Sequence, residues 1–523
     1  MIKRLYILAL LLMAVPCWAL QVVPGLYGFG TDTRAAYGNG QNPTIIVVNE
    51  LGAGDGLSDS TRNGVGVKEG SFKDAINYNV DNKFIIFEVS GNIPVNDILY
   101  LDNEYVTIAG ETAPSPGVTF KGLYLRVCAS DILISNMRIR QTDEAYPSPN
   151  AMDYQYRVGL VVGPSTGGSC TGKIPHNVVV NQSTVTWATD QNIGITGDIS
   201  NDAYDITLAN SIIGEGLRQS RHQKSTSGTF IGHSMGGIIQ YCNNVSVIRN
   251  LWISNNDRNP VIQESAELYF ANNFISHAKD LASYTDGASL IKLDYIGNVI
   301  EDDGVTSITD NFVIRFLSGS IAASSEFYLY DNYGVTVGTQ SSASNWGTGC
   351  TSGYTACNDG ANCCVRDQTA HSTVESNFAV TSAIDAPPGY TPLASSATKA
   401  HVVANAGAYP SDRDTVDTRL IADATNGVGT LIDSVVLADG DCVDADDPMG
   451  CCTALDTGPC DQNDEAGFPS LAENTTTHSD IPSSPHVDDD SDGYTNLEEW
   501  MVGTYSAVPT YPLRGVAGSF EYN

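Results

Sequence analysis

Basic side chains gather in one stretch of a chain that is otherwise strongly acidic. Arg218, Arg221, His222 and Lys224 follow one short apolar run, and Arg258 follows the next such run. The 523 residues carry 26 lysines and arginines against 60 aspartates and glutamates, so the formal net charge is −34. A surface of that charge repels polyanions at long range, which excludes nucleic acid as a ligand. The local cluster therefore predicts a site for an anionic ligand, held by these cations or by a bound metal.

Residues 488–499 form the sharpest motif, because they match a twelve-residue calcium-binding loop. Such a loop has oxygen donors at positions 1, 3 and 5, glycine at 6, a backbone carbonyl at 7 and a carboxylate at 12. Those positions hold Asp488, Asp490, Asp492, Gly493, Tyr494 and Glu499. A chance acidic loop is the alternative. Since no second loop of this kind is visible, we expect bound Ca²⁺ to hold the C-terminal tail in place.

Short apolar strands recur along the middle of the chain, and these elements must position the cationic cluster. Each run turns at Asn or Ser, and a second short run follows. The turning residues are Asn136, Ser183, Asn210, Asn250, Asn273, Asn298 and Asn332. Their spacing fits coils of roughly 20–25 residues that carry insertions. It predicts an all-β fold, a right-handed parallel β-helix with long loop insertions and an asparagine ladder between coils. A β-sandwich with Asn-rich turns is the alternative.

Two short amphipathic segments outside the coils predict helices. Residues 71–78 have the pattern of a helix that caps the open end of the solenoid. Near residue 420, one helical face is formed by Val416, Leu420, Ile421 and Ala424. We expect this second helix to lie on the side of the solenoid.

The N-terminus has the pattern of a secretory signal peptide. Lys3 and Arg4 precede the apolar run 5–15, and cleavage is expected after Ala19. A membrane anchor is the alternative, but the run is shorter than the roughly 20 residues of a spanning helix. We expect a secreted protein, extracellular or periplasmic. The expected segments are a signal peptide (1–19), a β-helix with its N-terminal cap (20–435), a Cys-containing insert and linker (436–486) and the calcium loop with its tail (487–523).

The cysteines fall into two groups. One of the twelve lies in the signal peptide, which leaves eleven (12 − 1) after cleavage. Eight lie in two polar inserts, at Cys350, Cys357, Cys363, Cys364, Cys442, Cys451, Cys452 and Cys460. Export predicts disulfides for these eight, with zinc binding as the alternative. Cys128, Cys170 and Cys242 lie among the coils, where we expect buried free thiols.

Several motifs together resemble the bacterial secreted pectate lyases of polysaccharide lyase family 1. They occur in the family's order over roughly residues 22–435. They are VPGLYGFGTDTR, FIIFEVSGNIPV, VTIAGETAPSPGVTFKG, VVVNQSTVTWATDQN, the HxK of Arg221-His-Gln-Lys224, NNDRNP and RDTVDTR. The resemblance implies cleavage of polygalacturonate by β-elimination with calcium as cofactor.

The resemblance also implies roles for individual residues. Arg258 matches the family's catalytic base, and Lys224 matches a lysine that binds the substrate carboxylate. His222 and Arg221 are expected to contact the sugar, and Asp190 to bind calcium in the cleft. Each also has a structural alternative: Arg258 closing a coil, Lys224 as a surface lysine of a loop, and His222 packing within that loop. Arg218 and Arg221 could equally pair with Glu215 or Asp257.

The chain departs from the family at the metal and substrate positions. Asn181 replaces one expected calcium carboxylate, and Gly194 stands where an acidic residue is common. Family members have a second arginine shortly after the catalytic one, and its position in this chain is near Gln263. These changes predict weaker calcium binding in the cleft, although Asn181 is still expected to be a ligand beside Asp190.

The sequence thus predicts a secreted, monomeric β-helix that cleaves pectate with Arg258 as base and without a membrane span. A non-catalytic β-helix that binds acidic polysaccharide, or serves as a surface scaffold, is the alternative. A hydrolase on the same fold would need clustered aspartates as acid and base. Asp190 alone is expected on that face, which argues against a hydrolase.

Overall fold

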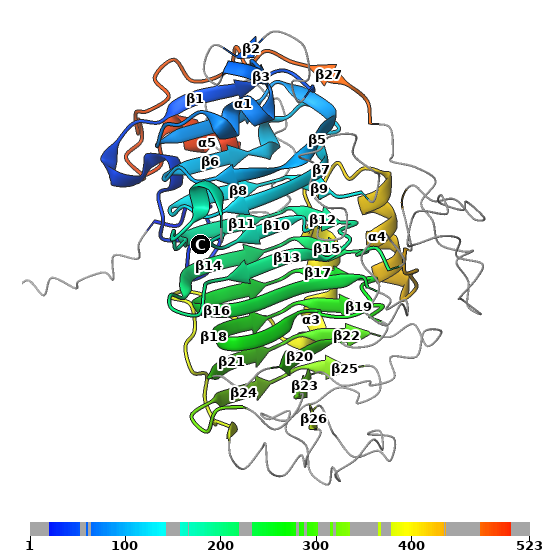
Figure 1. The fold of residues 1–523 in the computed structure, drawn as a ribbon. Helices are drawn as coiled ribbons and strands as arrows, with labels where there is room; N and C mark the ends of the chain where they lie inside the picture. Colours follow the sequence, from blue (N-terminus) through cyan, green and yellow to red (C-terminus); the bar gives the residue numbers. More distant parts are fainter. Residues whose placement is uncertain are drawn as a thin grey trace, which may run out of the picture.

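Parallel strands wind around a single axis in the computed structural model of this chain (Figure 1). The structure describes residues 20–52, 59–60, 64–142, 157–165, 167–218, 233–278, 282–286, 290–301, 314–316, 321–334, 365–367, 378–432, 435 and 471–503. Its main sheet has 25 strands, paired in parallel except where β27 (Asn474–Thr475) meets β5 (Val89–Leu101). The fold is therefore the predicted right-handed parallel β-helix.

Each coil contributes to three faces, which follow one another along the chain. Face 1 contains β1 (Thr44–Val48), β4 (Lys83–Phe87), β6 (Val106–Ala109), β8 (Ile132–Ser135), β11 (His176–Asn181), β14 (Ala203–Ala209), β21 (Ile291–Ile296) and β24 (Glu326–Tyr330). Face 2 contains β9 (Arg138–Arg140), β12 (Thr184–Thr186), β15 (Ile212–Gly214), β17 (Leu251–Ile253), β19 (Phe274–Ser276), β22 (Val299–Glu301) and β25 (Tyr333–Gly334). Face 3 contains β10 (Leu160–Val162), β13 (Gln191–Thr196), β20 (Ser283–Asp286), β23 (Ile314–Phe316) and β26 (Val365–Asp367).

Four long strands bend from one face to the next. β5 and β7 (Val118–Val127) run from face 2 into face 3, whereas β16 (Met235–Ile248) and β18 (Val261–Ala271) run from face 3 into face 1. Side chains alternate along every strand, so every second one points into the solenoid. Inward Ile, Val, Leu and Phe side chains from all three faces form one continuous core.

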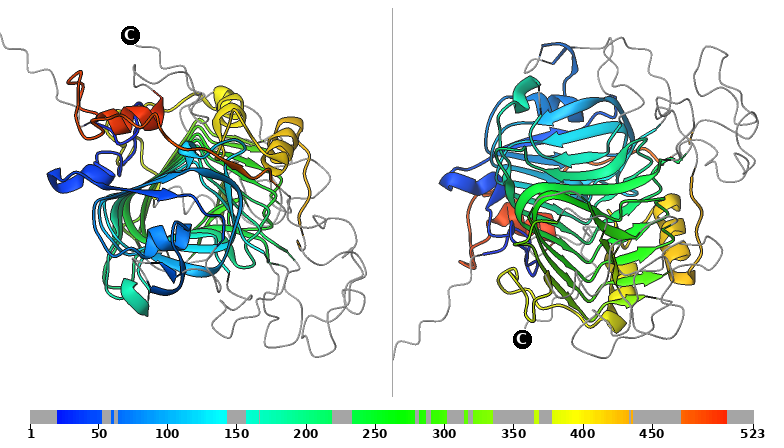
Figure 2. Two further views of the ribbon diagram at one scale, coloured as in Figure 1. Left: turned by 90° about the horizontal axis from the view of Figure 1, so that it is seen from above. Right: turned by 60° about the horizontal axis from the view of Figure 1, so that its bottom comes forward.

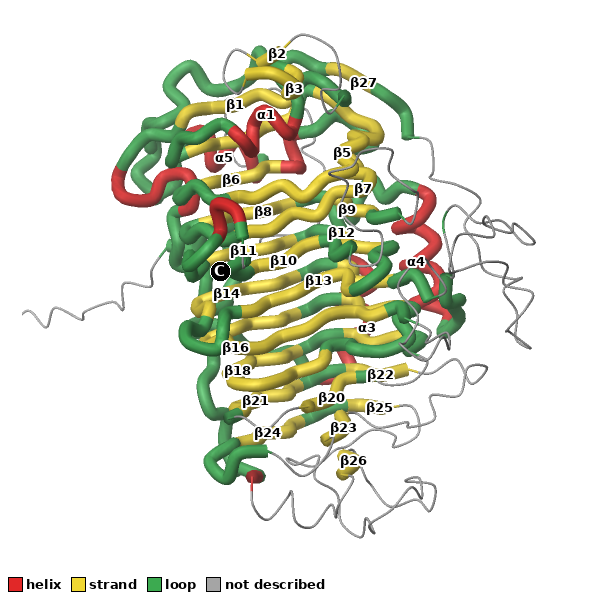
Figure 3. Tube along the Cα trace, viewed as in Figure 1, coloured by secondary structure: helices red, strands yellow, loops and turns green. Residues whose placement is uncertain are grey.

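Among the described residues, short helices and 3-10 turns cover the N-terminal end and parts of the sides of the solenoid (Figure 3). α1 (Phe72–Asn77) caps the N-terminal end and buries Phe72 against Phe87 and Phe120, as predicted (Figure 2). α4 (Thr415–Asn426) lies beside face 2 and buries Val416, Leu420 and Ala424, also as predicted. The other short elements are α3 (Ser395–Asn405), α5 (Asn496–Val502), η1 (Ala35–Gly40), η2 (Gly110–Thr112), η4 (Gly168–Cys170) and the antiparallel pair β2 (Asp59–Ser60) and β3 (Gly64–Lys68). In the described part of the chain, no helix is long and apolar enough to cross a membrane.

The asparagine ladder exists, but its register differs from the predicted one. Side-chain amides link Asn250, Asn273, Asn298 and Asn332 at sequence separations of 23, 25 and 34 residues. Ser183 and Ser211 continue this column. Asn136 and Asn210 instead lie in the column just before it, where the backbone has positive φ. The turn and the ladder, which were predicted at one position of each coil, therefore belong to two adjacent positions. Residues at the first position have the left-handed backbone conformation, and residues at the second form the ladder.

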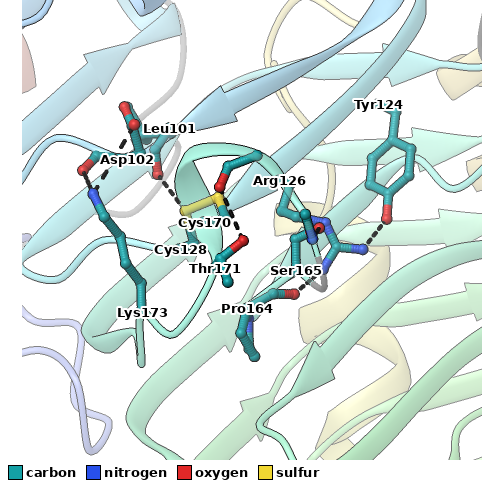
Figure 4. Close-up of a disulfide and its surroundings, with 12 residues drawn as sticks. Leu101, Asp102, Tyr124, Arg126, Cys128, Pro164, Ser165, Cys170, Thr171 and Lys173 are labelled. Atoms are coloured by element: carbon teal, nitrogen blue, oxygen red, sulfur yellow. Dashed lines mark hydrogen bonds and ion pairs between the residues drawn. A yellow bond between two sulfur atoms is a disulfide. The ribbon is translucent and has the colours of Figure 1, made fainter.

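Two further predictions are corrected. Cys128 and Cys170 form a disulfide with 5.5 Å between their Cα atoms, whereas Cys242 is a buried free thiol as expected (Figure 4). The eight cysteines of the inserts lie outside the described residues. Residues 471–486 were expected to be a linker, yet they pack on the N-terminal end of the solenoid, where β27 pairs with β5 and His478 donates its backbone N–H to Glu88.

Candidate functional site

The predicted base and the predicted cleft aspartate lie at the same end of face 3. Asp190 comes directly before β13, and Arg258 comes shortly before β18. In the sheet, Gln191 is level with Met235, which is level with Asp257. With β16 between them, two strand spacings of about 4.8 Å separate the two backbones, roughly 10 Å in all. The structure therefore brings Asp190 and Arg258 onto one edge.

The insert that carries the other predicted cations leaves the solenoid at this edge. Residues 219–232, with Arg221, His222 and Lys224, lie outside the described residues, and only the two ends of this insert can be placed. Leu217 donates its N–H to Ala188 O at 2.8 Å, and His233 donates its N–H to Arg218 O at 2.8 Å. The insert thus begins and ends at β15 and β16, next to the positions of Asp190 and Arg258.

The stem of the insert is fixed by a buried network. Glu215 is fully buried, accepts from the Trp187 indole at 3.0 Å and forms a salt bridge with Arg419 of α4 at 2.6 Å. Arg218 donates its N–H to Ile432 O, just after the same helix. These contacts explain why the helix predicted from Val416 and Leu420 lies where it does. It supports the chain segment that leads to Lys224.

Arg258 is half-buried and contacts an aromatic side chain from the next coil. Its guanidinium hydrogen-bonds the phenol of Tyr284 in β20, and its Nε has no hydrogen-bond partner among the described residues. Burial raises the pKa of Tyr284, Asp257 raises it further, and the charge of Arg258 opposes both. Asp257 accepts from the backbone N–H of Arg258 at 2.6 Å. The guanidinium is therefore held by a neutral phenol beside the groove.

Asp190 has a histidine as its neighbour. The His233 Nδ1 lies 3.1 Å from Asp190 O, and its Nε2 lies 3.8 Å from a carboxylate oxygen of Asp190. His233 was not singled out in the sequence. It lies two residues before β16, so the end of the insert is beside Asp190, the residue before β13. The sequence does mark this position, because His233 stands at the end of the polar insert, where the apolar strand pattern resumes.

Asn181 does not reach the cleft. It is buried at the corner between faces 1 and 2, where its side-chain oxygen accepts from Asn210 at 2.9 Å. Asp190 lies at the next corner, on the far side of face 2. The prediction that Asn181 shares a calcium ion with Asp190 is therefore wrong, because the residue belongs to the asparagine columns.

The C-terminal loop does gather ligands. Carboxylate oxygens of Asp488, Asp490 and Asp492 all lie within 4.8 Å of one another. Gly493 has φ +104°, a backbone conformation that other residues rarely adopt. Burial and the neighbouring aspartates raise the pKa of Glu499. The side-chain oxygen of Asn496 is buried and has no hydrogen-bond partner among the described residues. This set of oxygen donors fits Ca²⁺.

The loop is anchored to the start of the chain. Arg34 donates to Gly493 O at 2.8 Å and binds both carboxylate oxygens of Glu498. The Tyr494 hydroxyl donates to Gln21 O at 2.7 Å. Trp500, Leu497 and other residues of α5 pack with the apolar N-terminal residues. The predicted role in holding the C-terminal tail is therefore consistent with the contacts, since this tail packs on residues 21–37.

Comparisons with known proteins cover most of the chain. No family model matches it. Among solved structures, the cedar pollen allergen jun a 1 aligns over 72% of this chain and 91% of its own, with 13% identity and a TM-score of 0.44. Pectate lyase II of Xanthomonas campestris aligns over 75% of this chain and 100% of its own, with 12% identity and a TM-score of 0.40.

Curated relatives are similar in sequence over nearly the same length. Probable pectate lyase C of Aspergillus flavus is 29% identical over 493 residues, which is 92% of this chain and 93% of the relative. The protein of the same name from Aspergillus oryzae is 28% identical over 489 residues. These relatives are fungal, whereas the sequence motifs predicted a bacterial enzyme. Along almost its whole length, the chain is thus similar to proteins named as pectate lyases.

Proposed function

We propose that this protein is a pectate lyase that cleaves polygalacturonate by β-elimination, with Arg258 as the base. The observation that carries the proposal is the register of face 3, in which Arg258 and Asp190 lie on one edge, beside the two described ends of the insert that contains Lys224. The similarity to the probable pectate lyases of Aspergillus supports the same activity.

The reaction determines what the site must do. The base removes the proton at C5 of a uronate, the C4–O bond breaks, and a C4=C5 double bond forms. The departing oxygen takes up a proton and becomes the hydroxyl of the second fragment. Because negative charge develops on the carboxylate next to C5, fixed cations there stabilise the transition state.

The chain's own residues can supply these functions. Arg258 is half-buried at this edge, where its guanidinium hydrogen-bonds the Tyr284 phenol, and it would take the C5 proton of a sugar bound beside it. Lys224, which the family resemblance matches to a carboxylate-binding lysine, would neutralise the substrate. His222 and Arg221 on the same insert would contact the sugar. A guanidinium has an ordinary pKa above about 12, so its action as a base predicts a rate that rises with pH.

Calcium is assigned to the C-terminal loop. Asp488, Asp490, Asp492 and Glu499, with the Tyr494 carbonyl, would hold the ion there and fix the tail against residues 21–37. In the cleft, Asp190 is not part of any group of three metal-ligating side chains among the described residues. We therefore assign no step of the reaction to a cleft calcium.

Export completes the proposal. The signal-like residues 1–19 lie outside the described residues, but the Cys128–Cys170 disulfide is of the kind that forms in oxidising compartments. A secreted enzyme would meet its polysaccharide outside the cell.

The proposal is tested by mixing the purified full chain with polygalacturonate and following the ultraviolet absorbance of unsaturated uronide. Product formation by wild type, lost in Arg258→Ala, is the expected result. Binding of the polysaccharide without product would instead identify a non-catalytic binding protein.

A further inference from the structure

The outer side of face 3 forms a groove whose floor is apolar. A cavity of about 440 Å³ lies beside Asp190. Across its floor, strand register aligns Val161, Gly194 and Ile238 in one row. The same row continues beyond the cavity to Val261 and Tyr284, which are buried and do not line it. We call these five residues the apolar row. Since Tyr284 hydrogen-bonds Arg258, the row leads from the cavity to the proposed base.

More apolar side chains extend the floor at its N-terminal end. Tyr124 and Val158 pack with Val161, and Ile98 packs against them. At the other end, Val261 and Tyr284 pack together with Ile238. The two clusters lie on the solvent side of the sheet, whereas neighbours such as Ile193 and Ile239 point into the core. This surface is therefore apolar without being part of the solenoid interior.

Positive charge is scarce among the described residues of the groove. Arg126 is the one cation among the described residues that line the cavity. Its guanidinium already donates to the carbonyl oxygen of Pro164 and to the Tyr124 hydroxyl (Figure 4). A carboxylate above this part of the floor would therefore have to compete for the guanidinium.

The row beside the apolar row is neutral or acidic. Register aligns Thr196, Gln240, Gln263 and Asp286 there. Gln240 donates to Thr196 at 3.3 Å, and Gln263 donates to Asp286 at 3.2 Å. These amides and hydroxyls suit sugar hydroxyls, whereas the Asp286 carboxylate repels another carboxylate.

We propose that this groove binds uronan units whose carboxyl groups are methyl-esterified, on either side of the one ionised unit that is cleaved at Arg258. The inference rests on the proposed lyase function and deepens it by naming the substrate class. An ionised carboxylate placed on Val161 or Ile238 would lose water and, among the described residues of the cavity, would meet only Arg126, whose guanidinium already has two partners, which is unfavourable. A methyl ester has no charge to desolvate, and its methyl group adds apolar contact. The net charge of −34 acts in the same direction, because it repels a fully ionised chain.

The test compares kcat/KM on polygalacturonate with kcat/KM on the same polymer methyl-esterified to graded extents. We expect partly esterified chains to be cleaved at least tenfold more efficiently than the fully ionised polymer. Ile238→Lys adds a cation to the half-buried centre of the row and should lower that preference about tenfold. Ile98→Lys, at the cavity's edge, should lower it less and provides a second variant should the first not fold.

Ile199→Lys is the matched control. Ile199 is 84% exposed in the turn after β13 and does not line the cavity, so the substitution adds the same charge outside the apolar row and should leave the preference unchanged. Highest efficiency on polygalacturonate, with no response to Ile238→Lys, would overturn the substrate inference while the lyase stands. Absence of unsaturated product from every uronan would instead overturn the proposed function.

Discussion

Two acidic regions of the molecule differ in how many carboxylates they bring together. In the C-terminal loop, three aspartates converge within 4.8 Å and a buried amide oxygen lies nearby without a partner. At the edge of face 3, Asp190 faces His233 instead of further acids. The first arrangement is suited to a cation. The second leaves an edge where, in the proposed reaction, an anionic sugar would meet Arg258.

The difference follows from how each region is built. The loop takes its donors from consecutive residues 488–499, so one local backbone conformation gathers them. The groove edge takes one residue from each coil, and strand spacing keeps those residues about 4.8 Å or more apart. Calcium in this protein should therefore control stability at one end of the solenoid, and Arg258 should control the rate elsewhere.

The largest effect is expected from Arg258→Ala. Loss of a positioned base costs typically 10²- to 10⁴-fold, so we expect kcat on polygalacturonate to fall about 10³-fold. Arg249→Ala is the matched control, because Arg249 also has φ 58° but lies at the ladder corner over Tyr390. Its rate should stay near that of wild type. Equal losses in both variants, or a full rate in Arg258→Ala, would contradict the assignment of the base.

A second prediction concerns an isolated acid. Glu111 in η2 is buried and accepts from the Ser135 hydroxyl and from its own backbone N–H, and burial raises its pKa to about 7. Because this pKa is higher in the folded state than the ordinary value near 4.5 of the unfolded state, the protein is most stable below pH 4.5. Its free energy of unfolding then falls as the pH rises through 7. Glu111→Gln should remove the loss and be more stable at pH 9 by up to about 3 kcal/mol.

Urea unfolding from pH 4 to pH 9 measures this effect. Glu104→Gln, at an exposed position, removes the same charge and should leave the slope of wild type unchanged. Parallel curves for wild type and Glu111→Gln would show that Glu111 does not carry the pH dependence. The expected result would show that the Glu111 carboxylate, which has neither calcium nor a cationic side chain to stabilise it among the described residues, destabilises the N-terminal end at alkaline pH. This is the pH range in which Arg258 should be most active as a base.

Removal of calcium should affect stability more than rate. At a free calcium concentration of one hundred times Kd, binding adds about 2.7 kcal/mol. A chelator should therefore lower Tm by several degrees, while kcat at 25 °C stays within twofold. Asp490→Asn should abolish the calcium-dependent shift in Tm, and Asp489→Asn, which changes a position that is not a ligand, should retain it. A chelator that stops catalysis without changing Tm would move the functional calcium to the cleft.

The sequence predicted those parts of the fold in which each coil carries the same residue type at the same position. Asn250, Asn273 and Asn298 revealed the coils because a buried amide must find a partner one coil away. Face 3 was not predicted as a separate face. Its strands, such as β13 and β20, are interrupted by insertions and carry outward residues as varied as Gly194 and Tyr284, so no periodic residue marks them.

For the candidate site, sequence reasoning placed Asp190 and Arg258 correctly on one edge but misplaced Asn181. Asn181 and Asp190 are only nine residues apart, yet the short strand β12 turns the chain through two corners between them. His233 was missed because its neighbour Asp190 comes from the previous coil. Contacts between coils depend on insertion lengths, and those are not determined by the local pattern.

The smallest expected effect, Asp190→Asn, tests the groove edge most directly. A charge pair about 10 Å apart in water contributes roughly 0.4 kcal/mol, so removing Asp190's repulsion should lower KM for polygalacturonate about twofold. Asp198→Asn removes the same charge at the opposite end of β13 and should have less effect. A loss of calcium-dependent activity of 100-fold or more in Asp190→Asn would show that one carboxylate recruits calcium together with the substrate. The groove edge would then work like the C-terminal loop, with the sugar's own carboxylates completing the ligand set.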